Sequence, residues 1–227
     1  MEEASLFDIL TERYRLEETG CRLARISIVA ELNEAFPGQR ELYHDFMALF
    51  KNQDIAESTT GLVLVYPNYF HIVIELPEPS STALMEWIEK QETSGWISSA
   101  TVMCSELIQD RSFPPFAIQS VHLSTTKAGE YQASGPISTI VADVIVNSIR
   151  LARILTPLSP SQQQSTLDNI QFSHPELLTP QGVFAHIIRS ESLDRVAEYL
   201  SRNATMFQIK PDNELVWPMP VRLFPYD

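Results

Sequence analysis

The side chains that most often hold metals or move protons are spread thinly along this chain. Its five histidines are His44, His71, His122, His174 and His186. None stands in a His-x-x-x-His or His-Glu-x-x-His pattern, the spacing that puts two zinc ligands on one face of a helix. We therefore expect structural or exposed roles for the histidines and no metal site.

Nucleophilic and phosphate-binding motifs are also missing from the sequence. It has no Gly-x-Ser-x-Gly turn to present a serine, no phosphate-binding loop, and only seven glycines in all. A ligand-binding or hydrolytic enzyme would have no residue constellation to support it here. We therefore expect the chain not to be an enzyme.

The charge balance and the cysteines restrict the partners and the compartment. With 16 basic and 29 acidic residues, the formal net charge is −13, which should repel nucleic acid and anionic lipid membranes. Cys21 and Cys104 are too few for a secreted disulfide framework and lack metal spacing. The acidic start MEEASLFDILTERYR is unlike a signal peptide. These features predict a cytoplasmic protein that binds neither nucleic acid nor membrane.

Apolar periodicity in residues 21–124 predicts the order strand, helix, strand, strand, helix, strand, strand. The predicted strands are 21–32, 62–66, 70–76, 97–106 and one within RSFPPFAIQSVHL. Leu42, Phe46, Leu49 and Phe50 mark the apolar face of the first helix, and Ser80 or Ser81 can cap the second. This order predicts an α/β, ferredoxin-like sandwich of one mixed sheet with two helices on one face.

Three further segments flank this domain. A capping-box pattern at Ser5 predicts an N-terminal helix within residues 1–20. Residues 125–205 should form a helical extension, in which Pro136 opens a long apolar helix that must be buried against the sheet or a partner. TPLSPSQQQS reads as a polar connector, followed by helices near 180–188 and 192–202.

The last segment, 206–227, should be extended because its prolines interrupt any helix. It concentrates large apolar side chains on a stretch too short to form its own core, so these residues are the candidates for partner binding. They are Trp217, Leu223, Phe224 and Tyr226. Whether the tail packs on its own domain or in a groove on a neighbour stays open at this point.

Three motifs in residues 21–122 give the chain a family resemblance. They are Thr60-Gly61-Leu62 with Tyr66, the strand YFHIVIE, and RSFPPF with Phe116. In this order and spacing they resemble the BLUF domain, a blue-light sensor that uses FAD. The resemblance implies a BLUF-like fold.

The residues that serve the flavin in that family are not retained. The resemblance puts Ile28 where the family has its Tyr and Ile72 where it has its Gln, and isoleucine can neither donate nor accept a hydrogen bond. The region of the family's flavin-binding Asn offers Asn52, Gln53 and Asp54. The resemblance thus implies a fold without flavin, so no cofactor is expected.

Two polar positions in the matched motifs should be structural. Glu75, which fits the Glu that ends the third strand in the family, is expected to be a solvated carboxylate or a turn contact. Arg111 beside Phe113 is expected to form a packed corner and not a ligand site.

The phrase TGLVLVYP is similar to TGLLLIYP in the testis-expressed BLUF-like proteins of motile cilia and sperm flagella. This resemblance implies a structural or adaptor component of the axoneme, with other axonemal or ciliary proteins and another BLUF-like chain as its candidate partners. The alternative is a flavin-binding blue-light sensor that uses a divergent pocket between its two helices.

Overall fold

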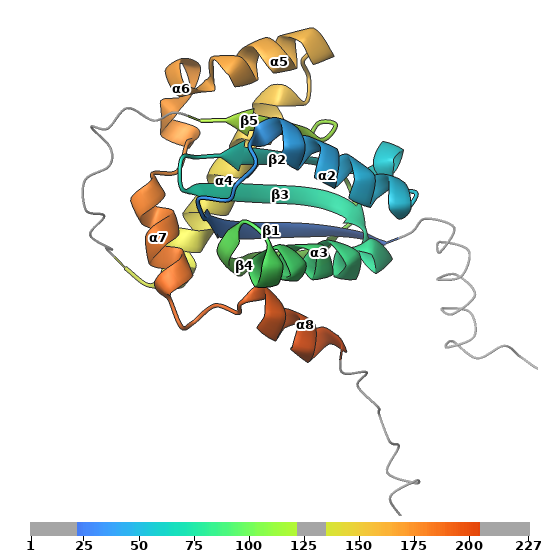
Figure 1. Cartoon of the computed structure of the whole chain (residues 1–227). Helices are drawn as coiled ribbons and strands as arrows, with labels where there is room; N and C mark the ends of the chain where they lie inside the picture. Colours follow the sequence, from blue (N-terminus) through green and yellow to red (C-terminus); the bar gives the residue numbers. More distant parts are fainter. Residues whose placement is uncertain (1–21, 122–134, 205–227) are drawn as a thin grey trace, which may run out of the picture.

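The computed structural model describes residues 22–121 and 135–204. The expected N-terminal helix lies outside the described residues, as do His122, Cys21 and the tail with Trp217, Leu223, Phe224 and Tyr226. Figure 1 shows the whole chain, with a sheet at its centre and helices on both sides.

Within these described ranges, five strands form one mixed sheet in the order β4-β1-β3-β2-β5. The strands are β1 Leu23–Leu32, β2 Thr60–Val65, β3 Tyr69–Pro77, β4 Ile97–Ile108 and β5 Ala117–Ser120. Neighbouring strands are antiparallel except β2 and β5, which run parallel. Two helices, α2 Gln39–Asn52 and α3 Ser81–Ser94, connect the first four strands and lie on one face. The predicted ferredoxin-like order is confirmed.

Gly61 explains one motif of the strand pair β2–β3. Its backbone has φ +150°, and a Cβ atom there would lie 2.5 Å from the carbonyl oxygen of Val73 on the paired strand. Only glycine permits this close approach without displacing β3. The glycine of the Thr-Gly-Leu motif is therefore a requirement of strand pairing in this sheet.

The helix α2 forms where the sequence predicts it. Leu42, Phe46 and Phe50, spaced at four residues, are at most 1% exposed and point into the core between the helices and the sheet. Their spacing keeps them on one face of the helix. Burying these side chains stabilises α2 on the sheet.

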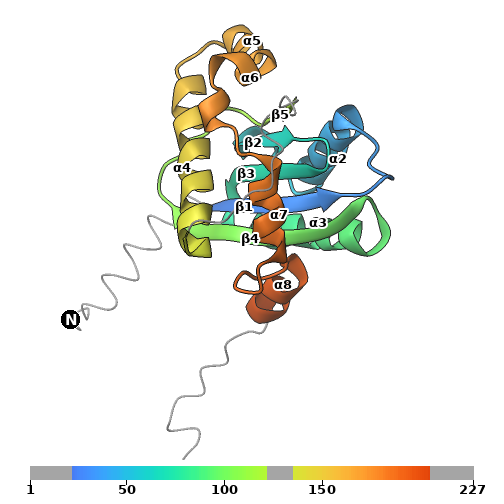
Figure 2. The same cartoon turned by 90° about the vertical axis from the view of Figure 1, so that its left-hand side faces the viewer.

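Most of the second half of the chain covers the other face of the sheet, whereas its last helix, Val196–Ala204, packs beside α3. The second half contains α4 Ile137–Leu155, α5 Pro160–Asp168, α6 Ile170–Ser173, α7 Gln181–Arg189 and α8 Val196–Ala204. A short 3-10 turn lies at Pro175–Leu177, and two others lie in the first half at Ala56–Ser58 and Glu78–Ser80. Figure 2 shows α4 and α7 crossing the strands on the side away from α2 and α3. The long apolar helix is thus buried against the sheet domain. None of the described helices is long and apolar enough to cross a membrane.

Two predictions about this half were wrong. The stretch TPLSPSQQQS is not a connector throughout, because α5 begins within it, with a capping box between Ser159 and Gln162 and Pro160 in the first turn. The last helix begins at Val196 and not at Ser192. Ser192 and Leu193 form a turn and a bend, and the next two residues contact β4: the carbonyl oxygen of Asp194 accepts a hydrogen bond from the N–H of Val102, and Arg195 forms a bridge with Thr101.

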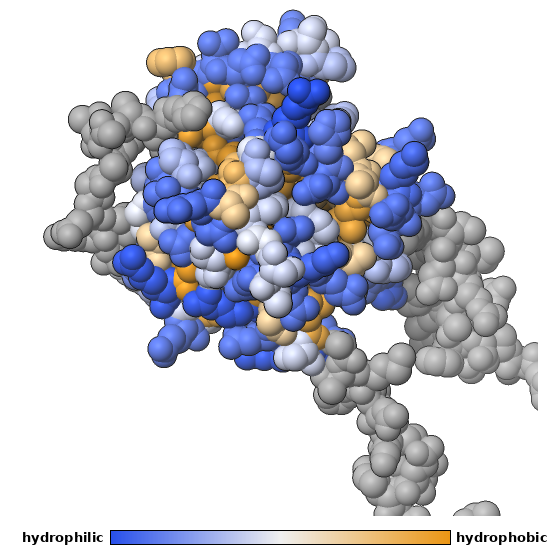
Figure 3. Space-filling model, in the orientation of Figure 1, coloured by the Kyte–Doolittle hydropathy of each residue, from blue (hydrophilic) through white to orange (hydrophobic). Residues whose placement is uncertain are grey.

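The protein surface carries both hydrophilic and hydrophobic residues. Figure 3 shows hydrophilic residues over most of the face seen in Figure 1, with hydrophobic residues in small patches between them. Four large apolar side chains are at least 42% exposed among the described residues, and they are Tyr43, Leu107, Val146 and Phe172. Single exposed apolar residues are ordinary, so a functional surface needs further features.

Candidate functional site

The resemblance to BLUF domains places the candidate flavin site in the space between α2, α3 and the sheet. Ile28 on β1 and Ile72 on β3 are directly opposite each other in the strand register, and both are fully buried. Directly paired residues in an antiparallel sheet point to the same face. The two side chains therefore form one continuous apolar floor beneath the helices, with no group that can exchange hydrogen bonds.

Aromatic rings fill the layer above this floor. Phe46 of α2 lies 4.8 Å from Trp87 of α3 and 5.3 Å from Phe116, measured between ring centroids. Phe50 meets Phe116 edge-on at 4.9 Å. These distances are those of packed aromatic pairs. The two helices are thus joined through side chains in direct contact.

The polar residues considered for flavin contact lie elsewhere. Asn52, Gln53 and Asp54 are all exposed at the C-terminal end of α2. A flavin ring needs hydrogen-bonding partners for its polar edge, and an unsatisfied buried group costs about 1 to 3 kcal/mol. With isoleucines below and packed rings above, the residues present do not fit a flavin.

On the opposite face of the sheet, His71 is buried under α7. Its Nε2 lies 3.1 Å from the hydroxyl of Ser27, and its ring centroid is 5.6 Å from that of Phe184. Burial lowers the pKa of His71 to about 3, so the imidazole is neutral at physiological pH. Among the residues that the structure describes, no carboxylate is hydrogen-bonded to Ser27 or His71, and both residues are buried. His71 therefore has the structural role expected for the histidines.

Glu75 departs from expectation. Its side chain is fully buried, and Arg25 Nη2 lies 2.8 Å from its Oε1 atom. The hydroxyl of Thr60 and the backbone N–H groups of Ser112 and Phe113 also donate hydrogen bonds to the carboxylate, at 2.8, 3.0 and 3.1 Å. The prediction of a solvated carboxylate was wrong, whereas the alternative of a turn contact agrees with these bonds from the loop residues Ser112 and Phe113.

The physical reason is the loop that leads from β4 to β5, which folds over the end of β3. Arg111 donates to the backbone oxygen of Glu75 at 3.0 Å, and Phe113 is 3% exposed. The prediction of a packed corner at Arg111 and Phe113 is confirmed. The position of Glu75 opposite Arg25 in the β1–β3 register would have indicated this ion pair. The sequence alone does not give that register.

This cluster has the chemistry of a structural brace. A carboxylate that accepts hydrogen bonds from a guanidinium, a hydroxyl and two backbone amides has no lone pair left to act as a base. Within residues 22–121 and 135–204, no group of three or more His, Cys, Asp or Glu side chains could hold a metal ion.

Comparison with known proteins identifies relatives of this chain. The sequence profile of a family described as testis-expressed protein 47 matches residues 22–204. The solved structures that match this chain include two of BLUF proteins. The BlrP1 BLUF structure has 14% sequence identity and a TM-score of 0.37, covering 70% of this chain and 96% of that one. The dark-state structure of BlrB has 16% identity and a TM-score of 0.34, covering 72% and 95%.

Proposed function

The chain belongs to the testis-expressed protein 47 family, and we propose that it is a non-enzymatic structural or adaptor component of a ciliary or flagellar axonemal assembly. The family match confirms the relationship predicted from TGLVLVYP. The family description supports a role in the testis, and the axonemal position and the adaptor role are our proposal.

The observation that carries this proposal is the closed interior between α2 and α3. Ile28 and Ile72 are fully buried at the positions where a BLUF sensor would contact its flavin, and Phe46 and Trp87 close the layer above them. A domain whose interior is packed with its own side chains has its outer surface available for function. This supports protein–protein contact over cofactor chemistry.

Contacts with partners would use the surface that the fold leaves exposed. The helices α4 and α7 occupy the sheet face that α2 and α3 leave open, so pairing with another BLUF-like chain would use a sheet edge or the outer side of a helix. The apolar tail residues Trp217, Leu223, Phe224 and Tyr226 remain our predicted partner anchors. Cytoplasmic location within the axoneme is part of the same proposal.

Two measurements test the proposal. Sperm that carry a tagged chain are extracted with detergent, and we expect the chain to stay with the axonemes and to be released by high salt. Complete release by detergent alone would contradict the axonemal role.

An absorption spectrum of the purified protein should be blank in the blue region. A flavin band that shifts on blue illumination would favour the alternative, a light sensor with a divergent pocket.

A further inference from the structure

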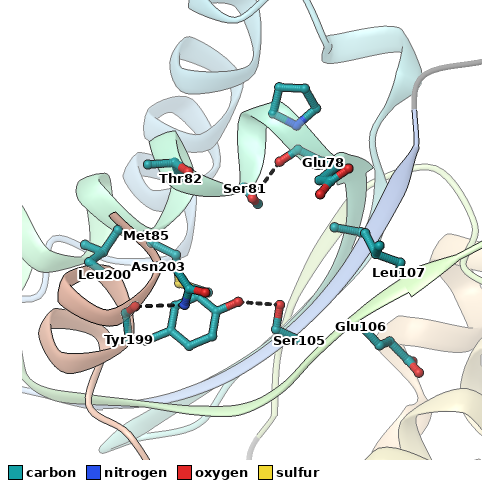
Figure 4. Close-up of a pocket in the computed structure, with 12 residues that line it drawn as sticks. Glu78, Ser81, Thr82, Met85, Ser105, Glu106, Leu107, Tyr199, Leu200 and Asn203 are labelled. Atoms are coloured by element: carbon teal, nitrogen blue, oxygen red, sulfur yellow. Dashed lines mark hydrogen bonds between the residues drawn. The ribbon is translucent and has the colours of Figure 1, made fainter. Parts of the chain in front are cut away.

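A groove of about 620 Å³ opens between α3, α8 and the C-terminal end of β4. Figure 4 shows its walls, with Met85 and Leu200 from the two helices on one side and Leu107 of β4 on the other. The hydroxyl of Tyr199 donates a hydrogen bond to Ser105 Oγ at 2.8 Å, which ties α8 to the strand at the groove. This groove is separate from the sealed interior between α2 and α3.

The groove lies beside the sheet edge that the described residues leave open. At the other edge, the side chain of Gln39 covers β5, donating to the carbonyl of Ile118 and accepting from the hydroxyl of Ser120, both at 2.6 Å. The middle of β4 is covered at Thr101, which forms a bridge with Arg195, and at Val102, whose N–H donates to the carbonyl oxygen of Asp194. An edge without such cover is a template for another strand.

The second half of β4 has this property. Ser105 to Ile108 pair with β1 on their inner side, and within the described ranges no strand pairs with them on the outer side. In an antiparallel strand, alternate residues direct their backbone N–H and C=O groups away from the paired neighbour. Leu107 is 58% exposed in the same stretch, so the edge offers backbone hydrogen bonds and an apolar contact together.

The charge of the groove sets the chemistry of what could bind there. Glu78 and Glu106 line it, and none of the described lining residues is basic. Glu106 already pairs with Arg25 at 2.9 Å, whereas no ion pair of Glu78 is found within the described ranges. The half-buried Glu78 carboxylate is therefore the group that a cation on a partner would meet.

We propose that this groove and the β4 edge at Ser105–Ile108 bind an extended segment of a partner protein that carries Lys or Arg between apolar residues. The segment adds a strand to β4 through its backbone, places its cation beside Glu78, and packs its apolar side chains on Leu107 and Leu200. The proposal rests on the proposed adaptor function and names the kind of partner that the adaptor takes.

The first test is amide hydrogen exchange on the purified full chain without any ligand. We expect the backbone amides of Ser105–Ile108 that point outward to exchange freely. Protection that does not depend on protein concentration would mean that the chain's own residues 205–227 or 1–21 cover the edge. Protection that rises with concentration would mean that a second copy does. Either result overturns the proposal.

The second test uses a designed probe, the acetylated and amidated hexapeptide Lys-Val-Lys-Leu-Lys-Val with a fluorescent label. We expect it to bind and to protect the amides of Ser105–Ile108. A peptide of the same sequence with N-methylated backbone on alternate residues keeps every side chain but cannot form the strand ladder. Equal binding of the two peptides would overturn strand addition, and so would binding that leaves these amides unprotected.

Two variants locate the binding site. Glu78→Lys reverses the charge in the groove, and Glu86→Lys makes the same change on the exposed side of α3, outside the groove lining. We expect Glu78→Lys to weaken the peptide about tenfold and Glu86→Lys to have a much smaller effect. Equal effects would show that the overall charge of −13 attracts the peptide, which overturns the site.

Leu107→Lys adds a charge to the strand edge itself, and we expect it to abolish peptide binding while the melting temperature stays that of the parent. Unchanged binding in this variant would also overturn the site. All of these measurements use purified protein, so their failure leaves the axonemal fractionation result standing, and failure of the fractionation leaves the groove standing.

Discussion

Arg25 joins three strands through two carboxylates of very different exposure. Its guanidinium lies 2.8 Å from Glu75 on β3, whose side chain is fully buried, and 2.9 Å from Glu106 on β4, whose side chain is 44% exposed. Arg25 is opposite both residues in the strand registers. One cation therefore makes a buried ion pair and a surface ion pair at the same level of the sheet.

This arrangement predicts unequal losses when either carboxylate is removed. Glu75→Ala leaves Arg25 and the amides of Ser112 and Phe113 without their buried acceptor, and the free energy of unfolding should fall by about 3 to 5 kcal/mol. Glu106→Ala removes a solvent-screened pair, and the loss should be below about 1 kcal/mol. Urea denaturation of the two variants measures both values. Equal losses would contradict a buried brace.

The buried His71 predicts a pH dependence of stability. Its pKa is lowered to about 3 by burial, whereas an unfolded histidine has a pKa of about 6.5. Between these values the unfolded chain binds a proton that the folded protein does not. The free energy of unfolding should therefore fall by about 1.4 kcal/mol for each pH unit below about 6.5 on account of this residue.

The measurement is urea denaturation at a series of pH values between about 7 and 5, where acid unfolding by carboxylates is small. The variant His71→Gln keeps a polar group near Ser27 without the titration, so its stability should change less with pH than that of the parent. His44→Gln, at an exposed histidine, is the matched control. A parent and a His71→Gln variant with the same pH slope would contradict the neutral buried imidazole.

The strand and helix order of the sheet domain could be predicted because it is written in local apolar patterns. The run Tyr69–Pro77 and the spacing of Leu42, Phe46 and Phe50 each identify their element without help from the rest of the chain. The helix α5 was missed for the opposite reason. Its sequence is polar, so it lacks the apolar periodicity that indicates a helix. Ser159 and Gln162 nevertheless have the spacing of a capping box.

Tertiary contacts decided the remaining differences. Asp194 and Arg195 have no strong local preference for strand, and they contact β4 because its edge is there to pair with. Glu75 is buried only because a loop more than thirty positions later in the chain brings the amides of Ser112 and Phe113 to it. Neither the contact of Asp194 and Arg195 with β4 nor the contact of Glu75 with the loop can be predicted from the residues adjacent in sequence.

The closed interior between α2 and α3 predicts that introducing the residues of BLUF domains will not create a flavin-binding site. Ile72→Gln places an amide in an apolar site, which should cost about 1 to 3 kcal/mol for the unsatisfied group, and Ile72→Val should cost about 1 kcal/mol. Both single variants should remain colourless after incubation with FAD and gel filtration. The double variant Ile28→Tyr with Ile72→Gln should remain colourless as well. A yellow protein would show that the rings of Phe46 and Trp87 can move aside.

The tail prediction separates partner binding from self-packing. If Trp217 and Phe224 dock on a neighbour, replacing both with alanine should lower retention of the chain on extracted axonemes while its melting temperature stays nearly unchanged. The polar pair Asp212→Ala with Glu214→Ala, in the same segment, controls for a general effect of changing the tail. A large drop in melting temperature for the aromatic pair would place these side chains in the chain's own core, because removing a buried aromatic ring costs about 3 to 5 kcal/mol. Unchanged retention with an unchanged melting temperature would contradict the assignment of Trp217 and Phe224 as anchors.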